Sequence, residues 1–362
     1  MRYDKHATTA LTDPPLCSPG ARKRQPHLHR RKPPMVVFLS RRPHEGQRSI
    51  ERVFSQVRKC LPPDVRHRLA VCRFTSHGVL PRVCNMVEAM ARQGDVNHIT
   101  GDVHYLALLL RKGRTLLTIH DCINLNRLTG LRRLIFFWLW YKLPEQRAAA
   151  ITVVSEATKQ ELLAHLRCSP EKIRVIHNPV ADEFQAAPAP FRAERPLVLQ
   201  VGTGLNKNLC RVAHALLGIP CRLRIIGRLS DRQRATLGEC SLDYSVAANL
   251  SDSQVAAEYR ACDLVVFAST YEGFGLPIVE ANATGRPVVT SNVSSMPEIA
   301  GDAACLVDPF DVGSIRAGIR KLIENTSYRE DLIRRGYRNV ERFRAQAVAA
   351  EYVRLYEELA AD

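Results

Sequence analysis

Two glutamates stand on either side of a glycine-rich turn: Glu272 precedes Gly-Phe-Gly at 273–275, and Glu280 follows it. Glycines allow a backbone to approach a ligand closely, and the N–H groups at a helix N-terminus attract phosphate or sugar oxygens. Pro277 suits the first turn of a helix, so we expect Glu280 on that helix, near the mouth of a pocket. There its carboxylate would accept hydrogen bonds from paired ribose hydroxyls. The alternative is an ordinary helix N-terminus, which collects acids because of its dipole.

A second candidate is the loop at 200–208, QVGTGLNKN, which overlaps the end of an apolar run. It reads G-x-G-x-x-K from Gly202 to Lys207, so the third glycine of a dinucleotide fingerprint is missing and a nicotinamide cofactor is only weakly indicated. Lys207 is either a ligand-facing cation or a solvated helix cap. Arg228, which follows Ile-Ile-Gly at 225–227, is either a second such cation or an ordinary exposed arginine.

His120 and Asp121 come directly after the apolar run at 117–119, at the point where a buried strand would end. Ligands of parallel α/β folds bind beyond the carboxyl ends of the strands, which favours a functional role for this pair. An isolated His-Asp pair is more often structural, so the pattern alone leaves both interpretations open.

The segment around the two glutamates resembles the E-x7-E motif of family-4 retaining glycosyltransferases, which have the two-domain GT-B fold. The resemblance spans roughly residues 35–355 and is most specific in the second half. Five strings are close to those of the family: FASTYEGFGLP (267–277), GRPVV (285–289), PEIAGDAA (297–304), VSE (154–156) and VIHNP (175–179).

This resemblance implies a role for each acidic and basic candidate. Glu272 would contact hydroxyls of the transferred sugar, and Glu280 would bind the ribose of the donor. Lys207 would neutralise the diphosphate as it leaves. Many members of the family carry an arginine where this chain has Thr203, and this departure leaves Arg228 as the candidate for the second cation.

The resemblance also implies contributions from the first half of the chain. His120 would reach the transferred sugar, and Gly46 matches a glycine loop that lies under the donor phosphates and beside the acceptor. The implied catalytic residues are His120, Lys207 and Glu272. The implied donor-binding residues are Gly46, Gly202, Thr203, Lys207, Arg228, Glu272, Gly273, Phe274, Gly275, Leu276 and Glu280.

Several common catalytic motifs are missing from the sequence. It contains no D-x-D, no G-x-x-x-x-G-K-[ST], no H-E-x-x-H and no G-x-S-x-G,. We therefore expect no metal and no cofactor, with the nucleotide sugar acting as the donor substrate. A metal-free mechanism needs protein cations and helix N-termini to stabilise the leaving diphosphate.

The composition is strongly basic, with 52 Lys+Arg against 36 Asp+Glu in 362 residues and a net charge of +16. Eight of these cations lie in residues 1–34, which are rich in proline and are expected to form a disordered extension,. A basic chain attracts phosphorylated ligands, nucleic acid or an acidic membrane surface. The 11 cysteines include no C-x-x-C pair, which fits neither a disulfide framework nor a zinc site and indicates reduced, cytosolic thiols,.

Short apolar runs alternate with helical patterns from Met35 onwards, which predicts parallel strands covered by helices on both faces,. Ser49 is expected to cap the first helix. The expected strands are 35–39, 69–74, 96–99, 115–119, 150–154 and 172–176 in the first half, and 197–201, 222–226, 244–247, 263–267, 287–290 and 305–307 in the second. The last helices are expected at 312–324, 328–343 and 347–359.

A proline-rich stretch interrupts this alternation of strands and helices, which indicates a linker between two domains,. The fold class we predict is α/β, with two Rossmann-like domains whose parallel sheets face a central cleft. The expected divisions are an extension (1–34), an acceptor domain (35–180), a linker (181–196), a nucleotide-sugar domain (197–345) and a final helix that packs back on the acceptor domain (346–362).

The stretch LRRLIFFWLWYK at 131–142 is apolar and aromatic between basic ends. It is either a buried helix or an interfacial element that meets anionic lipid. Similar family members act on lipid-linked acceptors at the cytoplasmic face of the membrane. No apolar run reaches the ~18 residues that span a bilayer, and no signal-peptide pattern begins the sequence. We therefore expect a cytoplasmic protein with peripheral contact at the inner face of the cell membrane.

The sequence predicts a retaining, metal-independent glycosyltransferase. It would move a hexose from a nucleoside-diphosphate sugar to a glycan or lipid-linked saccharide, in surface polysaccharide or lipopolysaccharide synthesis. One alternative is a nucleotide-sugar epimerase with the same fold. Another is a basic nucleic-acid-binding protein, which is disfavoured because no interleaved aromatic and basic motif is present.

Overall fold

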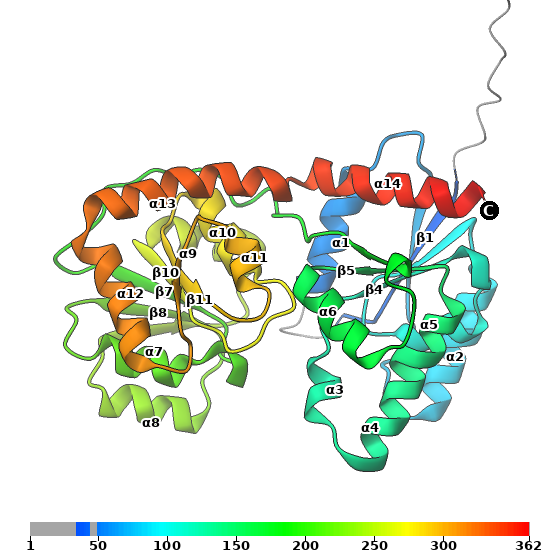
Figure 1. The fold of residues 1–362 in the computed structure, drawn as a ribbon, viewed down its shortest axis with the longest axis horizontal. Helices are drawn as coiled ribbons and strands as arrows, with labels where there is room; N and C mark the ends of the chain where they lie inside the picture. Colours follow the sequence, from blue (N-terminus) through cyan, green and yellow to red (C-terminus); the bar gives the residue numbers. More distant parts are fainter. Residues whose placement is uncertain (1–33, 44–48, 362) are drawn as a thin grey trace, which may run out of the picture. The chain divides into compact units, whose positions relative to one another are not determined.

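The computed structural model describes residues 34–43 and 49–361, and these contain two six-stranded sheets. The first sheet has the order β2-β1-β3-β4-β5-β6, and the second has the order β12-β11-β10-β7-β8-β9. All strand pairs are parallel. The protein therefore has the predicted α/β class, with two parallel sheets covered by helices (Figure 1).

The strands follow the predicted apolar runs closely. In the first sheet they are β1 (Val36–Ser40), β2 (His67–Val71), β3 (Val96–Ile99), β4 (Thr115–Ile119), β5 (Ala150–Val153) and β6 (Ile173–Val175). In the second sheet they are β7 (Leu197–Val201), β8 (Arg222–Ile226), β9 (Tyr244–Ala247), β10 (Leu264–Phe267), β11 (Val288–Ser291) and β12 (Cys305–Val307).

Helices lie between most successive strands, and α12 to α14 follow the last strand. Those of the first half are α1 (Ser49–Lys59), α2 (Val79–Ala91), α3 (Ile123–Arg127), α4 (Gly130–Phe137), α5 (Leu143–Arg147) and α6 (Glu156–His165). Those of the second half are α7 (Leu209–Leu216), α8 (Asp231–Glu239), α9 (Asp252–Ala261), α10 (Leu276–Thr284), α11 (Met296–Ala300), α12 (Val312–Glu324), α13 (Thr326–Asn339) and α14 (Ala345–Ala361). Short helical turns add η1 (His104–Leu109), η2 (Lys112–Arg114), η3 (Trp138–Lys142), η4 (Pro170–Lys172), η5 (Leu205–Lys207) and η6 (Val340–Phe343).

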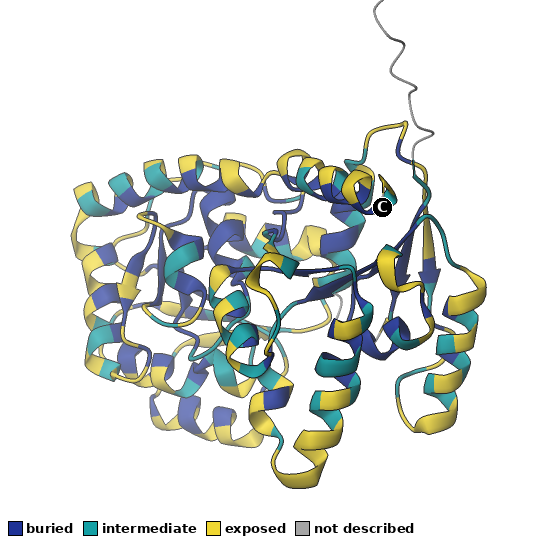
Figure 2. Cartoon of the chain, turned by 45° about the vertical axis from the view of Figure 1, so that its right-hand side comes forward, coloured by how far each residue is buried: buried dark blue, intermediate teal, exposed yellow. Residues whose placement is uncertain are grey.

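The central strands are apolar on both faces because helices cover both sides of each sheet. Along β1, Val37 and Leu39 enter one hydrophobic cluster, whereas Val36 and Phe38 enter another on the opposite face. This alternation is the period of two that side chains have in a strand. Figure 2 shows the result as dark blue strands beneath helices whose outward surfaces are yellow.

The edge strand β2 begins and ends earlier than the sequence predicts. We expected a strand at 69–74, but β2 begins at His67, which is paired with Val36 of β1. Because β2 lies at the edge of the sheet, its first three residues are exposed, and the first two, His67 and Arg68, are polar,. The apolar pattern therefore marks only part of this strand.

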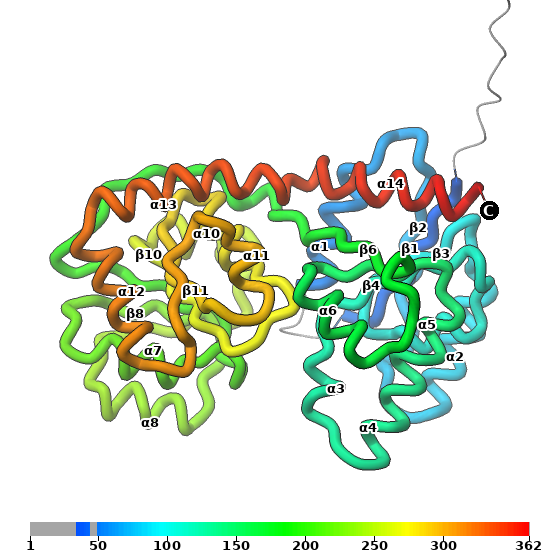
Figure 3. The backbone as a smooth tube through the Cα atoms, in the orientation of Figure 1, coloured from blue at the N-terminus to red at the C-terminus, as the bar shows by residue number. Residues whose placement is uncertain are grey.

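The last helix, α14, packs on the first sheet and on α1 rather than on the second sheet that precedes it (Figure 3, red). Tyr352 and Tyr356 join the hydrophobic cluster that contains Phe38 and Phe54. The Tyr356 hydroxyl lies 2.8 Å from Nδ1 of the fully buried His98. Burial lowers the pKa of His98 to about 3, so this imidazole is neutral at physiological pH,.

Candidate functional site

A cavity of about 350 Å³ lies beyond the carboxyl ends of strands from both sheets. Such ends are where open α/β sheets bind ligands, because loops there present backbone and side-chain groups to one space. The lining residues are Ser49, Ile50, Arg52 and Val53 of α1; His120, Asp121, Val154 and Asn178 beyond the first sheet; Val201, Lys207, Ile226 and Val255; and Glu272, Gly273, Phe274, Gly275, Leu276, Pro277 and Glu280.

Lys207 and Glu272 meet inside this cavity. The Lys207 Nζ atom lies 2.6 Å from Oε1 of Glu272, and the Asn206 amide donates to the same oxygen at 3.1 Å. Gly202 allows this position of the lysine, because a Cβ at Gly202 would lie only 3.0 Å from Lys207 Cε and the backbone there has a φ of +86°. The structure thus brings together the predicted cation and the first predicted glutamate.

The glycine-rich turn contacts the first half of the chain. A Cβ on Gly273 would lie 1.9 Å from the His120 carbonyl oxygen, so only glycine fits at this position. The Gly273 carbonyl accepts hydrogen bonds from the hydroxyls of Ser155 (2.7 Å) and Thr158 (3.0 Å). The backbone of the turn is therefore fixed against the ends of β4 and β5.

Helix α10 begins at Leu276, directly after this turn, and its N-terminus opens into the cavity. Gly275 occupies the position before the helix with a φ of +110°, and no side chain of the described residues caps this end. The first backbone N–H groups of a helix have no partner within the helix and carry part of its positive dipole. This end of α10 can therefore receive an anion or sugar oxygens.

Glu280 lies one turn further along α10 and is only 3% exposed. Its Oε1 atom accepts a hydrogen bond from Nη2 of Arg52 at 2.7 Å, and its Oε2 atom accepts one from the Tyr259 hydroxyl at 2.7 Å. Burial and the adjacent Glu280 carboxylate raise the pKa of Tyr259, which keeps the phenol protonated and donating,.

Arg52 and Tyr259 are site residues that the sequence analysis did not identify. They lie on α1 and α9, in the first and second halves of the chain, so no local spacing connects either of them with Glu280. The one available signal was an arginine on the first turn of the helix that Ser49 begins, near the carboxyl end of a predicted strand.

His120 borders the cavity in a neutral form. Its Nε2 atom lies 3.0 Å from the carbonyl oxygen of Thr100 and donates to it, because a carbonyl can only accept,. Burial lowers the pKa of His120 to about 4, so Nδ1 remains an unprotonated acceptor at neutral pH,. Burial also raises the pKa of the neighbouring Asp121, whose Oδ1 atom accepts the backbone N–H of Ile123 at 3.0 Å.

The remaining predicted residues lie around this centre or outside the described part. Thr203 and Arg228 are not among the residues that line the cavity. The Thr203 hydroxyl donates to the Arg228 carbonyl at 2.7 Å, and Arg228 is exposed. Gly46 falls in the segment 44–48, outside the described residues. Within the described ranges, no group of three or more His, Cys, Asp or Glu has the geometry to hold a metal ion.

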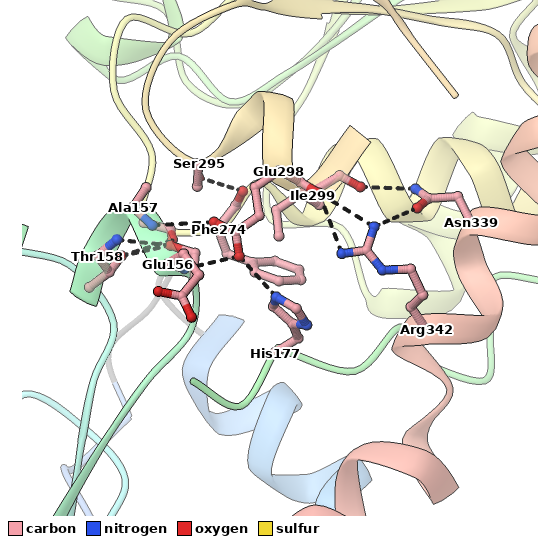
Figure 4. Close-up of polar contacts among 12 residues, drawn as sticks. Glu156, Ala157, Thr158, His177, Phe274, Ser295, Glu298, Ile299, Asn339 and Arg342 are labelled. Atoms are coloured by element: carbon pink, nitrogen blue, oxygen red, sulfur yellow. Dashed lines mark hydrogen bonds and ion pairs between the residues drawn. The ribbon is translucent and has the colours of Figure 1, made fainter. Parts of the chain in front are cut away.

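The Glu298 carboxylate also joins the two halves of the chain (Figure 4). Glu298 of α11 accepts the backbone N–H groups of Glu156 (2.9 Å) and Ala157 (3.2 Å) at the N-terminus of α6. It also contacts Nε2 of His177 at 3.0 Å. Burial opposes ionisation of Glu298, but the hydrogen bonds from His177 and the two N–H groups outweigh it and lower its pKa,. Glu298, Glu156 and His177 all come from strings that carry the family resemblance.

Two family descriptions match consecutive parts of the chain: Glycosyltransferase Family 4 over residues 26–184 and Glycosyl transferases group 1 over residues 182–339. The chain is 40% identical over 105 residues to O-antigen chain mannosyltransferase B of Escherichia coli, which covers 29% of this chain and 28% of that protein. It is 30% identical over 221 residues to MMP alpha-(1->4)-mannosyltransferase of Mycolicibacterium hassiacum, which covers 57% of this chain and 53% of that protein. The matches therefore span about a quarter and about half of these relatives.

The fold also matches solved structures. Anabaena HepE, solved in complex with UDP and glucose, superposes with a TM-score of 0.73 and 14% identity, covering 90% of this chain and 100% of that one. The two parallel sheets, the cavity between their carboxyl ends and the consecutive family matches lead to one assignment: the chain belongs to the family-4, group-1 glycosyltransferases, with the GT-B fold.

Proposed function

We propose that this protein transfers a hexose from a nucleoside-diphosphate sugar to a glycan or lipid-linked saccharide, with retention of configuration and without a metal ion. The observation that supports this most directly is the grouping of Lys207, Glu272 and Glu280 around the uncapped N-terminus of α10 in one cavity. A cation and a helix dipole suit a diphosphate, and carboxylates suit the hydroxyls of a sugar and of a ribose.

The donor would lie along α10. Glu280 would accept hydrogen bonds from the ribose hydroxyls, and the N–H groups at residues 275–276 would receive phosphate or sugar oxygens. Lys207 would contact the diphosphate while keeping Glu272 turned towards the sugar, since its Nζ atom already lies 2.6 Å from that carboxylate. The His120 Nδ1 atom is unprotonated at neutral pH and would accept a hydrogen bond from a sugar hydroxyl.

The chemistry we propose is displacement on one face of the sugar. The bond between the anomeric carbon and the diphosphate oxygen breaks, and the acceptor oxygen forms its bond on the same face. The departing phosphate takes the proton of the acceptor hydroxyl, so neither glutamate has to act as a nucleophile. Lys207 stabilises the negative charge that develops on the diphosphate, and preorganised groups of this kind act mainly in the transition state.

The base and sugar are best found by experiment. Thermal unfolding should be followed with a panel of UDP-, GDP- and ADP-hexoses, because a donor at 100 times its Kd adds ~2.7 kcal/mol to the free energy of unfolding. Both relatives described above are named mannosyltransferases, so GDP-mannose is the first donor to test. The product's anomeric configuration, read by NMR, then tests retention. Transfer that requires an added divalent cation would contradict the metal-free mechanism.

For a lipid-linked acceptor, we also propose that the first half of the chain contacts a membrane. Exposed apolar side chains on two of its helices support this contact. On α4 and the following turn η3 the most exposed are Leu131 (70%), Leu134, Ile135 and Trp138 (44%). On α2 they are Val79 (76%), Leu80, Val83, Val87 and Met90. Arg82 of α2 lies over the Trp140 ring, and Phe136 of α4 stacks against the same ring, which connects the two helices.

The stretch 131–142 is partly buried and partly exposed. Phe136 and Phe137 pack against the core of the first sheet, whereas Leu131, Leu134, Ile135 and Trp138 face outwards beside the exposed Arg132 and Arg133. Substitutions at Phe136 or Phe137 would therefore disturb the fold and are poor probes of lipid binding. Within the described residues, no helix has both the length and the apolar character needed to cross a bilayer.

The membrane contact can be tested by sedimentation with anionic vesicles. Protein lacking residues 1–34 should sediment and be released by salt, because each cation near such a surface contributes ~1 kcal/mol. Changing Leu131, Leu134, Ile135 and Trp138 to serine should abolish sedimentation while the folded signal persists. The control is Leu306→Ser on β12, which is also exposed but belongs to the second sheet. If the truncated wild type stays in solution, a soluble acceptor becomes the better proposal.

A further inference from the structure

The buried carboxylate of Glu280 is held by side chains from two separate elements. Arg52 reaches it from α1 through Nη2, and Tyr259 reaches it from α9 through its hydroxyl, each at 2.7 Å. Each bond uses a different carboxylate oxygen, Oε1 for the arginine and Oε2 for the tyrosine. Both oxygens of the carboxylate are therefore held, which fixes the orientation of its plane.

The arginine itself is held in place by its other contacts. Its Nη1 atom lies 3.2 Å from Oδ1 of Asp252, at the first residue of α9. Its guanidinium lies 5.8 Å from the centroid of the Phe184 ring, and that ring packs edge-on against Tyr259 at 5.3 Å. Because a guanidinium has donors in a rigid planar fork, two acceptors and one aromatic ring define a single position for it.

Glu280 keeps acceptor capacity on the side of the cavity. An ionised carboxylate offers about four lone-pair positions, of which Arg52 and Tyr259 use two. Arg52 and Glu280 both line the cavity, whereas Tyr259 is fully buried behind them. The carboxylate therefore has acceptor positions left for the two ribose hydroxyls of the proposed function.

We infer that Arg52 is a positioning residue for donor recognition: it orients Glu280 so that the carboxylate reads the 2′- and 3′-hydroxyls of the nucleotide. This inference rests on the proposed function, in which Glu280 binds the ribose. It means that the ribose site, although carried by α10 of the second half, is completed by α1 of the first half. Arg52 acts through Glu280, so its removal should affect hydroxyl recognition more than the transfer step.

The experiment is calorimetric titration with UDP and GDP, each compared with its 2′,3′-dideoxy counterpart. The wild type should bind its preferred nucleotide at least about tenfold more tightly than the dideoxy form, because hydrogen bonds to a charged acceptor are the stronger class. In Arg52→Gln, binding of the ordinary nucleotide should fall by about the same factor, while binding of the dideoxy form should barely change. The ratio between the two ligands should therefore approach one.

Two further variants make the result specific. Arg52→Lys retains a cation but loses the planar fork of donors. Its preference for the ordinary over the dideoxy nucleotide should therefore lie between that of the wild type and that of Arg52→Gln. The matched control is Arg224→Gln, which removes a comparably short ion pair to Glu258, the neighbour of Tyr259 on α9, away from the cavity. It should leave both affinities unchanged. In steady-state kinetics, Arg52→Gln should raise the donor KM about tenfold and change kcat by less than about threefold.

The possible outcomes separate the inference from the proposed function. If the wild type distinguishes the two ligands and folded Arg52→Gln does so equally well, the positioning role is wrong. If the wild type binds both forms equally, the ribose role of Glu280 fails first. If Arg52→Gln does not fold, Arg52→Lys decides, since an undiminished ratio in that variant overturns the need for the fork.

Discussion

Glu280 and Glu298 both join the two halves of the chain, but they do so with different kinds of partner. Glu298 accepts two backbone N–H groups of α6 and contacts His177, and it does not line the cavity. Glu280 is held by two side chains and borders the cavity. Glu298 is therefore held mainly by backbone groups of the fold, whereas Glu280 is held by side chains alone and lines the cavity where we propose that the donor binds. Burial alone would not separate these two roles.

The largest effect should come from Lys207, the cation that lines the same cavity as Glu280. We expect Lys207→Ala to lower kcat about a hundredfold, the scale seen when one preorganised group that stabilises transition-state charge is lost. Thermal stability should change little, because the lysine is partly exposed,. Steady-state kinetics with the preferred donor measures the change. A variant with wild-type turnover would transfer the role to another cation, such as Arg228.

Glu272 should show a loss of transfer without a loss of nucleotide binding. Its partners are Lys207 and Asn206, and the proposed ligand contact is to the sugar rather than to the nucleotide. We expect Glu272→Ala to lower kcat/KM for transfer by tenfold or more, roughly the value of a charged hydrogen bond made in the transition state. Calorimetry with the free nucleoside diphosphate serves as the control, and weakened binding there would contradict this division of roles.

Removal of the Glu280 carboxylate should weaken donor binding rather than turnover. Loss of ribose hydrogen bonds to a charged acceptor corresponds to about 1.5–3 kcal/mol, or about ten- to a hundredfold in affinity. Glu280→Gln, measured by calorimetry, keeps the shape of the side chain and removes the charge. Unchanged affinity for the nucleotide would mean that the ribose binds elsewhere. Glu280 would then not differ from Glu298 in ligand binding.

Glu298→Gln should do the reverse and affect stability more than binding. We expect the free energy of unfolding in urea to fall by about 1–3 kcal/mol, because an amide nitrogen replaces one acceptor facing the α6 N–H groups. Donor affinity in the folded variant should stay within about twofold of the wild type. A selective loss of donor binding at unchanged stability would show that Glu298 belongs to the ligand site.

The pH dependence of this stability difference provides a finer test. The pKa of Glu298 is lowered in the folded protein from its ordinary value of 4.5. Below that value the unfolded chain binds the proton more readily than the folded one, so the stabilisation is present above pH 4.5 and is lost as the pH falls. The difference between wild type and Glu298→Gln should therefore shrink below pH 4.5. A constant difference would mean that charge plays no part in this contact.

Much of the fold could be predicted because most strands are marked by local patterns. The runs at β3, β4 and β7 match the expected bounds, since buried parallel strands are apolar along their length,. The bounds of β8, β9 and β12 also match, although these strands carry exposed residues. The edge strand β2 was misplaced because its exposed first residues are polar. Helix α13 begins earlier than expected, since Asn325 accepts the Tyr328 N–H and caps it,.

The candidate site could be predicted only where motifs are local. Glu272, Glu280 and Lys207 come from short strings, and the structure places all three at one cavity. Arg52 could not be paired with Glu280, because 228 positions separate them and only the packing of α1 brings them together. The Glu298 contact cannot be predicted for the same reason, although the string PEIAGDAA that contains Glu298 resembles the family.

The return of α14 to the first sheet has a consequence for how the protein is made. Tyr352 and Tyr356 complete the hydrophobic cluster around Phe38 and Phe54, yet they are synthesised after every strand of the second sheet. Domains usually fold in order as the chain leaves the ribosome. Here the hydrophobic cluster of the first half stays incomplete until the second half has been synthesised, because only then does α14 become available to complete it. Folding of the two halves is therefore linked in time as well as in space.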